Sequence, residues 1–180
     1  MTITYAVGQR LTAALLQQMA DYTVNRPSLT LTQQSAQSIS NNTTTALTFG
    51  AGSEAGVGTY AGWHSTSVNT SRISPTTAGY YDVVFGLSMA APSVSFSQLL
   101  AAVGVTGTRI PPQRTSRPST TTAAAMTLIV VARDVYMDGT SSMYIEGYVN
   151  QQQSSGTAAQ NTSVASGFAS ILQVIWARPF

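Results

Sequence analysis

The stretch that most constrains the fold runs from Gly79 to Met89, because large apolar side chains occupy every second position from Tyr81 onward. Polar or small residues separate them, and Val84 is the single exception. A period of two is typical of a β-strand with one buried face. The residues expected to face a core are Tyr81, Val83, Phe85, Leu87 and Met89.

Short strand-like runs separated by turn residues follow one another along most of the chain, as an antiparallel sandwich requires. The expected strands cover residues 28–34, 44–49, 62–65, 71–75, 80–90, 126–137, 142–150 and 168–177. Residues 97–105 fit a helix or a strand. The most apolar run, 123–132, is typical of a central strand, and Asp138-Gly139 predicts a hairpin turn after it. At 180 residues, one domain over 28–180 and an arm over 1–27 are expected.

The arm differs from the rest because its apolar residues recur at helical spacing. Thr12 is a candidate N-cap, and Arg26-Pro27 ends the pattern. A helix this short is marginal alone, so its stripe needs a partner. The partner is the chain's own domain, two sister helices or another protein. The stripe residues are Leu11, Leu15, Met19 and Tyr22.

Composition limits the chemistry available to the chain. Charged residues make up 8% of it, lysine and cysteine are absent, and the net charge is +2. His64 is the only histidine, the acidic residues are scattered, and no catalytic constellation, metal site or cofactor site is predicted. No run approaches the roughly 20 apolar residues that span a bilayer, so no membrane partner is expected. A basic-then-apolar leader is lacking, which favours assembly in a cytoplasm.

The one local concentration of charge lies between residues 109 and 122, where three prolines predict no regular element. Guanidinium groups on such a stiff strip suit docking onto an acidic protein surface, and the alternative is an exposed loop with solvated side chains. No aromatic residues interleave the arginines, so nucleic acid is not favoured. The arginines are Arg109, Arg114 and Arg117.

The segment from Ile73 to Val83, which leads into the alternating stretch, carries a family resemblance. The spacing of Ile73, Pro75, Gly79, Tyr81 and Val83 resembles the central motif of tumour-necrosis-factor-like jelly rolls. The resemblance implies an all-β, antiparallel jelly-roll sandwich in which three protomers pack side against edge. It implies a homotrimer that buries surplus aromatic residues. The interface candidates are Tyr80, Tyr144, Tyr148 and Trp176.

A second resemblance lies in residues 5–16, followed by 34–49 and the turn 50–52. These segments resemble the N-terminal region of small virion proteins from tailed phages of actinobacteria. The resemblance implies a non-enzymatic decoration or minor capsid protein on the outer surface of a virion, in contact with major capsid or tail proteins. The alternatives are a minor tail or receptor-binding module that binds a host surface glycan, and a hydrolase with two carboxylates across a cleft.

Overall fold

Two β-sheets pack face to face in the computed structural model, which describes Ala13 and residues 26–58, 60–92, 95–116, 125–165 and 169–179, without the side chains of 112–116. The first sheet has five strands in the order β4 (Glu54–Val57), β1 (Ser28–Thr32), β11 (Ile171–Arg178), β5 (Gly79–Met89) and β8 (Met126–Met137). The second has four, in the order β3 (Thr45–Ala46), β9 (Ile145–Gln153), β6 (Phe96–Val105) and β7 (Thr108–Ser116). A small pair joins β10 (Gln160–Asn161) to β2 (Ser38–Ile39).

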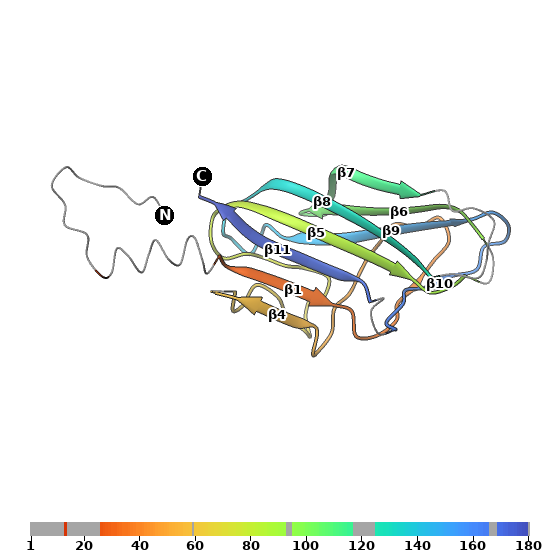
Figure 1. Cartoon of the computed structure of the whole chain (residues 1–180), viewed down its shortest axis with the longest axis horizontal. Coiled ribbons are helices and arrows are strands. Elements are labelled where there is room, and N and C mark those ends of the chain that lie inside the picture. The colour runs from red at the N-terminus through yellow and green to blue at the C-terminus, as the bar shows by residue number, and fades with distance from the viewer. Residues whose placement is uncertain are drawn as a thin grey trace.

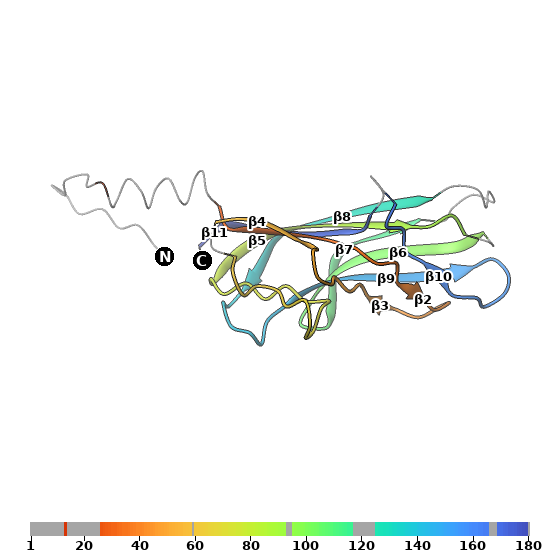
Figure 2. The same ribbon diagram turned by 90° about the horizontal axis from the view of Figure 1, so that it is seen from below.

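The chain passes repeatedly from one sheet to the other, so neighbouring strands in a sheet, apart from β6 and β7, are not consecutive in sequence. β5 lies in the first sheet, β6 and β7 in the second, β8 in the first and β9 in the second. Each pairing between named strands is antiparallel. Figure 2 shows the two layers edge-on, and Figure 1 shows β1 beginning and β11 ending at the same end. This arrangement confirms the predicted antiparallel jelly-roll sandwich.

The core lies between the two sheets, and β5 supplies its centre. The five predicted inward residues, Tyr81 to Met89 in alternation, have no exposed surface. The ring of Phe85 crosses to the opposite sheet and lies against Gly147, where an added Cβ would come within 2.5 Å of the ring. The absence of a side chain at Gly147 therefore makes room for Phe85, and the two residues bring the sheets into contact.

The corner before β5 depends on Gly79. Its φ is +153°, and a Cβ there would lie 2.7 Å from the carbonyl oxygen of Arg178 and 2.8 Å from the indole nitrogen of Trp176. Backbone and indole thus approach the chain more closely than a side chain allows. The glycines at 79 and 147 are therefore explained by close packing against specific neighbours.

The prediction of no regular element over 109–122 is wrong for residues 109–116, which belong to β7. The strand tolerates its prolines for two reasons. β7 is the last strand of its sheet, so only one side of it needs hydrogen-bond donors. The pairing with β6 also shifts register between Ala102 and Val103, which leaves Pro111 and Pro112 unpaired in the ladder. Residues 117–122 lie outside the described residues.

The predicted hairpin at Asp138-Gly139 is also wrong. β8 ends at Met137 and β9 begins at Ile145, and these two strands belong to different sheets, so the connection crosses the sandwich. Gly139 does adopt a positive φ of 79°. The Asp138 carboxylate accepts hydrogen bonds from the backbone and the hydroxyl of Thr140, at 2.8 and 2.7 Å, and these bonds lower the pKa of Asp138.

Other sequence expectations differ in detail. The run 97–105 is a strand, β6. Residues 62–65 and 71–75 form turns and bends instead of strands, with one isolated bridge from Ile73 to Ile145. The apolar run 123–132, expected in a central strand, contributes to β8, which lies at the edge of its sheet. The predicted helical stripe of the arm lies outside the described residues.

Candidate self-association surface

The outer face of β8 is apolar although β8 is an edge strand. Alternate residues point into the core, among them Val130 and Ala132, which are buried. The residues between them point outward and remain open: Ile129 is 55% exposed, Val131 42% and Tyr136 42%. Antiparallel sheets usually carry polar residues on a solvated face. Large apolar side chains on an exposed face and at a sheet edge therefore make this the candidate surface for association with another molecule.

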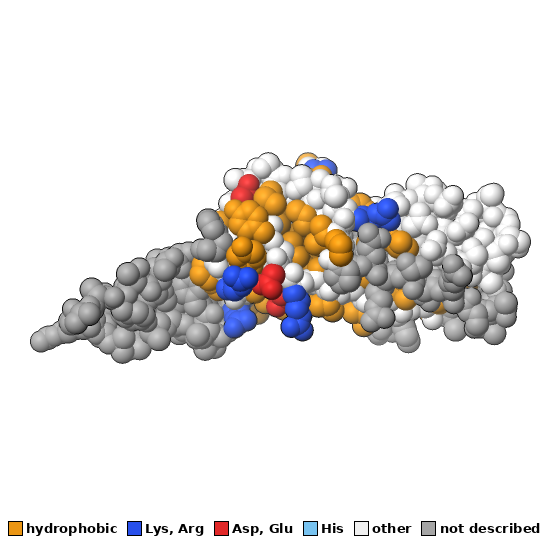
Figure 3. Space-filling view, turned by 90° about the horizontal axis from the view of Figure 1, so that it is seen from above, with side chains coloured by type: hydrophobic (Ala, Val, Ile, Leu, Met, Phe, Trp, Pro, Cys, Tyr) orange, Lys and Arg blue, Asp and Glu red, His pale blue; other side chains and the backbone are white. Residues whose placement is uncertain are grey.

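The apolar surface continues inward across two neighbouring strands. Val131 of β8 is paired with Val84 of β5. Ile129 is paired with Gly86, and Gly86 is paired on its other side with Ile171 of β11. The Ile171 side chain leans over Gly86, where an added Cβ would meet it at 2.9 Å. We call these residues, with Tyr136, the β8 face; Figure 3 shows orange side chains gathered along this side of the sandwich.

A β-bulge brings charged residues to one end of the β8 face. Tyr81 pairs with Val135 and Val83 with Ala132, so Asp82 stands opposite both Arg133 and Asp134. Asp134 has a φ of 54°, in the left-handed region that Asp adopts more readily than most residues. Blue and red side chains lie beside the orange ones at this end in Figure 3.

One ion pair is formed within the protomer at this end of the β8 face, between Arg178 and Asp134. Arg178 of β11 donates from Nε and Nη2 to Oδ1 of Asp134, at 3.2 and 3.0 Å. Its guanidinium lies 4.1 Å from the ring centre of Tyr80, and the Tyr80 and Tyr136 rings lie 5.8 Å apart. Cation, carboxylate and two phenol rings thus form one unit at the rim of the β8 face.

The predicted interface residues do not lie together. Tyr80 is half-buried at the rim of the β8 face. Tyr144 precedes β9 and Tyr148 lies within it, in the other sheet. Trp176 is 3% exposed and belongs to the protomer's own core. Of the four, only Tyr80 adjoins the β8 face. The residues that make up that face were not among the predicted interface residues.

The predicted partner-binding residues are described only in part. Leu11, Leu15, Met19 and Tyr22 lie outside the described residues, as does Arg117. Arg109 is exposed on β7. Arg114 lies on the same strand, but its side chain is outside the described part. The predicted roles of the arm and of the three arginines therefore stay predictions.

In the opposite sheet, the Glu146 carboxylate of β9 binds Ser71 and Arg72, which belong to the irregular segment before β5. The Glu146 side chain is nearly buried, and its Oε1 accepts from the Ser71 hydroxyl at 2.7 Å and from Nε of Arg72 at 3.3 Å. The Tyr148 hydroxyl donates to its Oε2. Burial raises the pKa of the Tyr148 phenol, and the bond to Glu146 raises it further. Arg72 also lies 3.9 Å above the Tyr144 ring.

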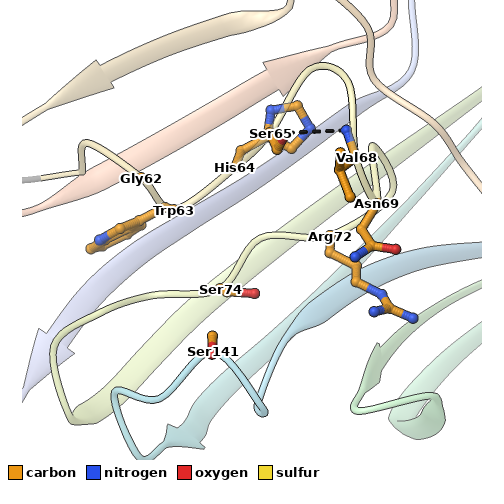
Figure 4. Close-up of a pocket in the computed structure, with 9 residues that line it drawn as sticks. All are labelled: Gly62, Trp63, His64, Ser65, Val68, Asn69, Arg72, Ser74 and Ser141. Atoms are coloured by element: carbon orange, nitrogen blue, oxygen red, sulfur yellow. Dashed lines mark hydrogen bonds between the residues drawn. The ribbon is translucent and has the colours of Figure 1, made fainter.

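The same segment encloses a hollow of about 260 Å³. His64 lies beside it, with Nδ1 2.7 Å from Oε1 of Glu54 and Nε2 3.2 Å from the carbonyl oxygen of Thr70. Ser65 accepts a hydrogen bond from the Val68 backbone at 3.1 Å, and Ser141 comes from the loop after β8 (Figure 4). Both imidazole nitrogens thus lie within hydrogen-bonding distance of an oxygen, and these contacts join the segment to β4.

Aromatic and metal-binding features are limited in the part of the chain that the structure describes. Trp63 is buried, and its indole lies 3.3 Å from the Thr76 hydroxyl oxygen. With Trp176 also buried, neither tryptophan forms a stacking platform. The described residues contain no group of three or more His, Asp or Glu placed to hold a metal ion. They also contain no helix long and apolar enough to cross a membrane.

The strand arrangement matches solved structures of very different sequence. One is the Eiger TNF of S. frugiperda, 9% identical, with a TM-score of 0.54 over 87% of this chain and 95% of that one. Another is the globular domain of zebrafish complement 1qA protein, 9% identical, with a TM-score of 0.54 over 86% of this chain and 99% of that one. No protein-family model and no curated protein matches the sequence. The chain thus has a jelly roll of the tumour-necrosis-factor and complement type.

Proposed function

We propose that this chain is a non-enzymatic structural protein that works as a homotrimer, with the β8 face of each subunit covered by its neighbour. The outward Ile129, Val131 and Tyr136 on an edge strand are the observation that carries the proposal. Covering them removes apolar area from water and shields the open hydrogen-bonding groups of the edge.

A second copy of the chain suits this surface because the surface carries charges of both signs. Asp82, Arg133, Asp134 and Arg178 surround its end, so a copy brings a complement for each. The resemblance at Ile73 to Val83 to a family of trimeric jelly rolls sets the expected number of subunits at three. Closed cyclic assembly also covers each β8 face once, without leaving a free edge.

The first test measures the mass of the purified chain in solution by multi-angle light scattering. We expect about three times the protomer mass of 18.9 kDa. Val131→Glu places a charge in the β8 face and should shift the protein toward 18.9 kDa. The matched control is Val68→Glu, because Val68 is 65% exposed in a loop remote from the β8 face. A wild-type monomer at micromolar concentration, or a trimer unaffected by Val131→Glu, contradicts the proposal.

We further propose that the trimer sits on the outside of a tailed-phage virion. The support is the resemblance of residues 5–16 and 34–52 to small virion proteins, together with the low charge of the chain, which suits a protein largely covered in an assembly. Residues 1–27 and the arginines Arg109, Arg114 and Arg117 would then contact major capsid or tail proteins. The mechanism is mechanical, since each added contact raises the barrier to disruption of the particle.

Deleting residues 1–25 tests the attachment role of the arm. Because β1 begins only at Ser28, the truncated body should keep its melting temperature within a few degrees and lose its place on the particle. Calorimetry and electron microscopy of particles carrying labelled protein measure the two outcomes. Unfolding of the truncated body would show that the stripe completes the domain's own core, and unchanged incorporation would exclude the arm as the attachment.

A further inference from the structure

Two opposite charges at the rim of the β8 face are left without a partner. Asp82 of β5 is half-buried and Arg133 of β8 is exposed. They stand on paired strands at the bulge, yet neither side chain makes a hydrogen bond or an ion pair with any residue that the structure describes. The neighbouring Asp134 and Arg178 do pair, at 3.0 Å. The bulge therefore supplies one satisfied pair and one unsatisfied cation and anion.

Such a concentration of charge is unusual for this chain. Eight arginines and six acidic residues are all the charged side chains in 180 residues. Asp82, Arg133, Asp134 and Arg178 nevertheless lie within one bulge and the strand end beside it. An apolar surface alone sets no register between two subunits, because it can slide with little loss of contact. Paired charges at its rim do set the register.

The proposed self-association, on which this inference rests, changes the surroundings of both groups. When a neighbour covers the β8 face, Asp82 and Arg133 lose water, and a charge that loses water needs an ionic partner. The neighbour is the same chain and brings the same two groups. In a threefold ring, each contact is heterologous, so one patch of a subunit meets a different patch of the next. We infer that Arg133 of each subunit pairs with Asp82 of the next and fixes the register of the trimer.

Charge exchange tests this pairing. Arg133→Glu and Asp82→Arg each place like charges at every contact, so each alone should weaken association at least tenfold. The double variant restores opposite charges and should recover most of the lost affinity. Val68→Glu is again the control, because Val68 is 65% exposed in a loop remote from the β8 face and the added charge should leave association unchanged. Sedimentation velocity gives the association constants, and circular dichroism confirms that each variant is folded.

Mixing the two single variants separates a contact between subunits from one within a subunit. In a mixed trimer, two of the three contacts join unlike variants and bring opposite charges together, whereas the third joins two copies of one variant and keeps like charges, so assembly should return in part. Recovery in the double variant but none in the mixture means that the pair forms inside one subunit, which overturns the inference. Wild-type association of both single variants also overturns it. In either case, dissociation by Val131→Glu would still uphold the proposed trimer, so the two failures are distinguishable.

Discussion

Replacing Phe85 by alanine should lower the free energy of unfolding by about 3–5 kcal/mol, the usual cost of deleting a buried aromatic ring. Phe85 has no exposed surface, and its ring fills the space that Gly147 leaves on the opposite sheet. The substitution therefore opens a cavity where the two sheets are held together. Collapse of Gly147 into the gap is limited, because a glycine has no side chain to move.

Urea denaturation followed by tryptophan fluorescence measures the effect, since both tryptophans are buried in the folded chain. The control is Val57→Ala on β4, because Val57 is 53% exposed and its loss should cost less than about 0.5 kcal/mol. A loss below about 1 kcal/mol for Phe85→Ala would mean that the inward face of β5 is wrongly assigned.

Replacing Glu146 by alanine should cost about 3 kcal/mol, because three donors lose a charged acceptor at once. Ser71 and Arg72 approach from the segment before β5, and Tyr148 approaches from β9 itself. The nearly buried carboxylate thus fastens a long irregular segment to the outer side of the four-stranded sheet. Its loss should also expose residues 62–74 to proteases, which cut mobile loops preferentially.

Glu146→Gln is the informative comparison for this network. The amide keeps one oxygen acceptor and nearly the same volume, but it turns a donor toward groups that also donate. An intermediate loss, with partial protection from proteolysis, is therefore expected. Equal stability of Glu146→Ala and the wild-type chain would show that the segment is held by its other contacts, such as the His64 to Glu54 pair.

The sequence predicted the strands whose pattern depends only on burial. β5 alternates large apolar with polar or small residues, except at Val84, because one of its faces meets the core, and β8 matches its expected bounds of 126–137. Strands set by their place in the sheet were not predictable. β7 carries Pro111 and Pro112, which propensity excludes from a strand, and only its edge position and register shift admit them. β4 is short, exposed and rich in small residues, so it has no burial pattern.

The β8 face could not be predicted from the sequence, for a related reason. The run 123–132 is apolar on both faces of the strand, which is typical of a strand covered on both sides. Within one chain that pattern indicates a central strand, whereas β8 is an edge strand. The sequence shows that Ile129 and Val131 are apolar, but not that the face of the strand on which they lie stays exposed in the protomer. Links such as Ser71 to Glu146, which join residues 75 positions apart, leave no periodic signal.

The loop between β9 and β10 is held through its main chain. Gln151 and Gln153 extend from β9 and donate their side-chain amides to the carbonyl oxygen of Ala158, at 3.3 and 2.9 Å. Every residue has such a carbonyl, and the side chains of 154–159 are exposed. Two positions have their own role, because the Ser154 hydroxyl donates to the carbonyl oxygen of Ser95 at 3.0 Å and Gly156 has a φ of 79°. The side chains at 155 and 157–159 are free to change while the loop keeps its anchor, which makes 157–159 a suitable position for sequence variation or for a grafted peptide.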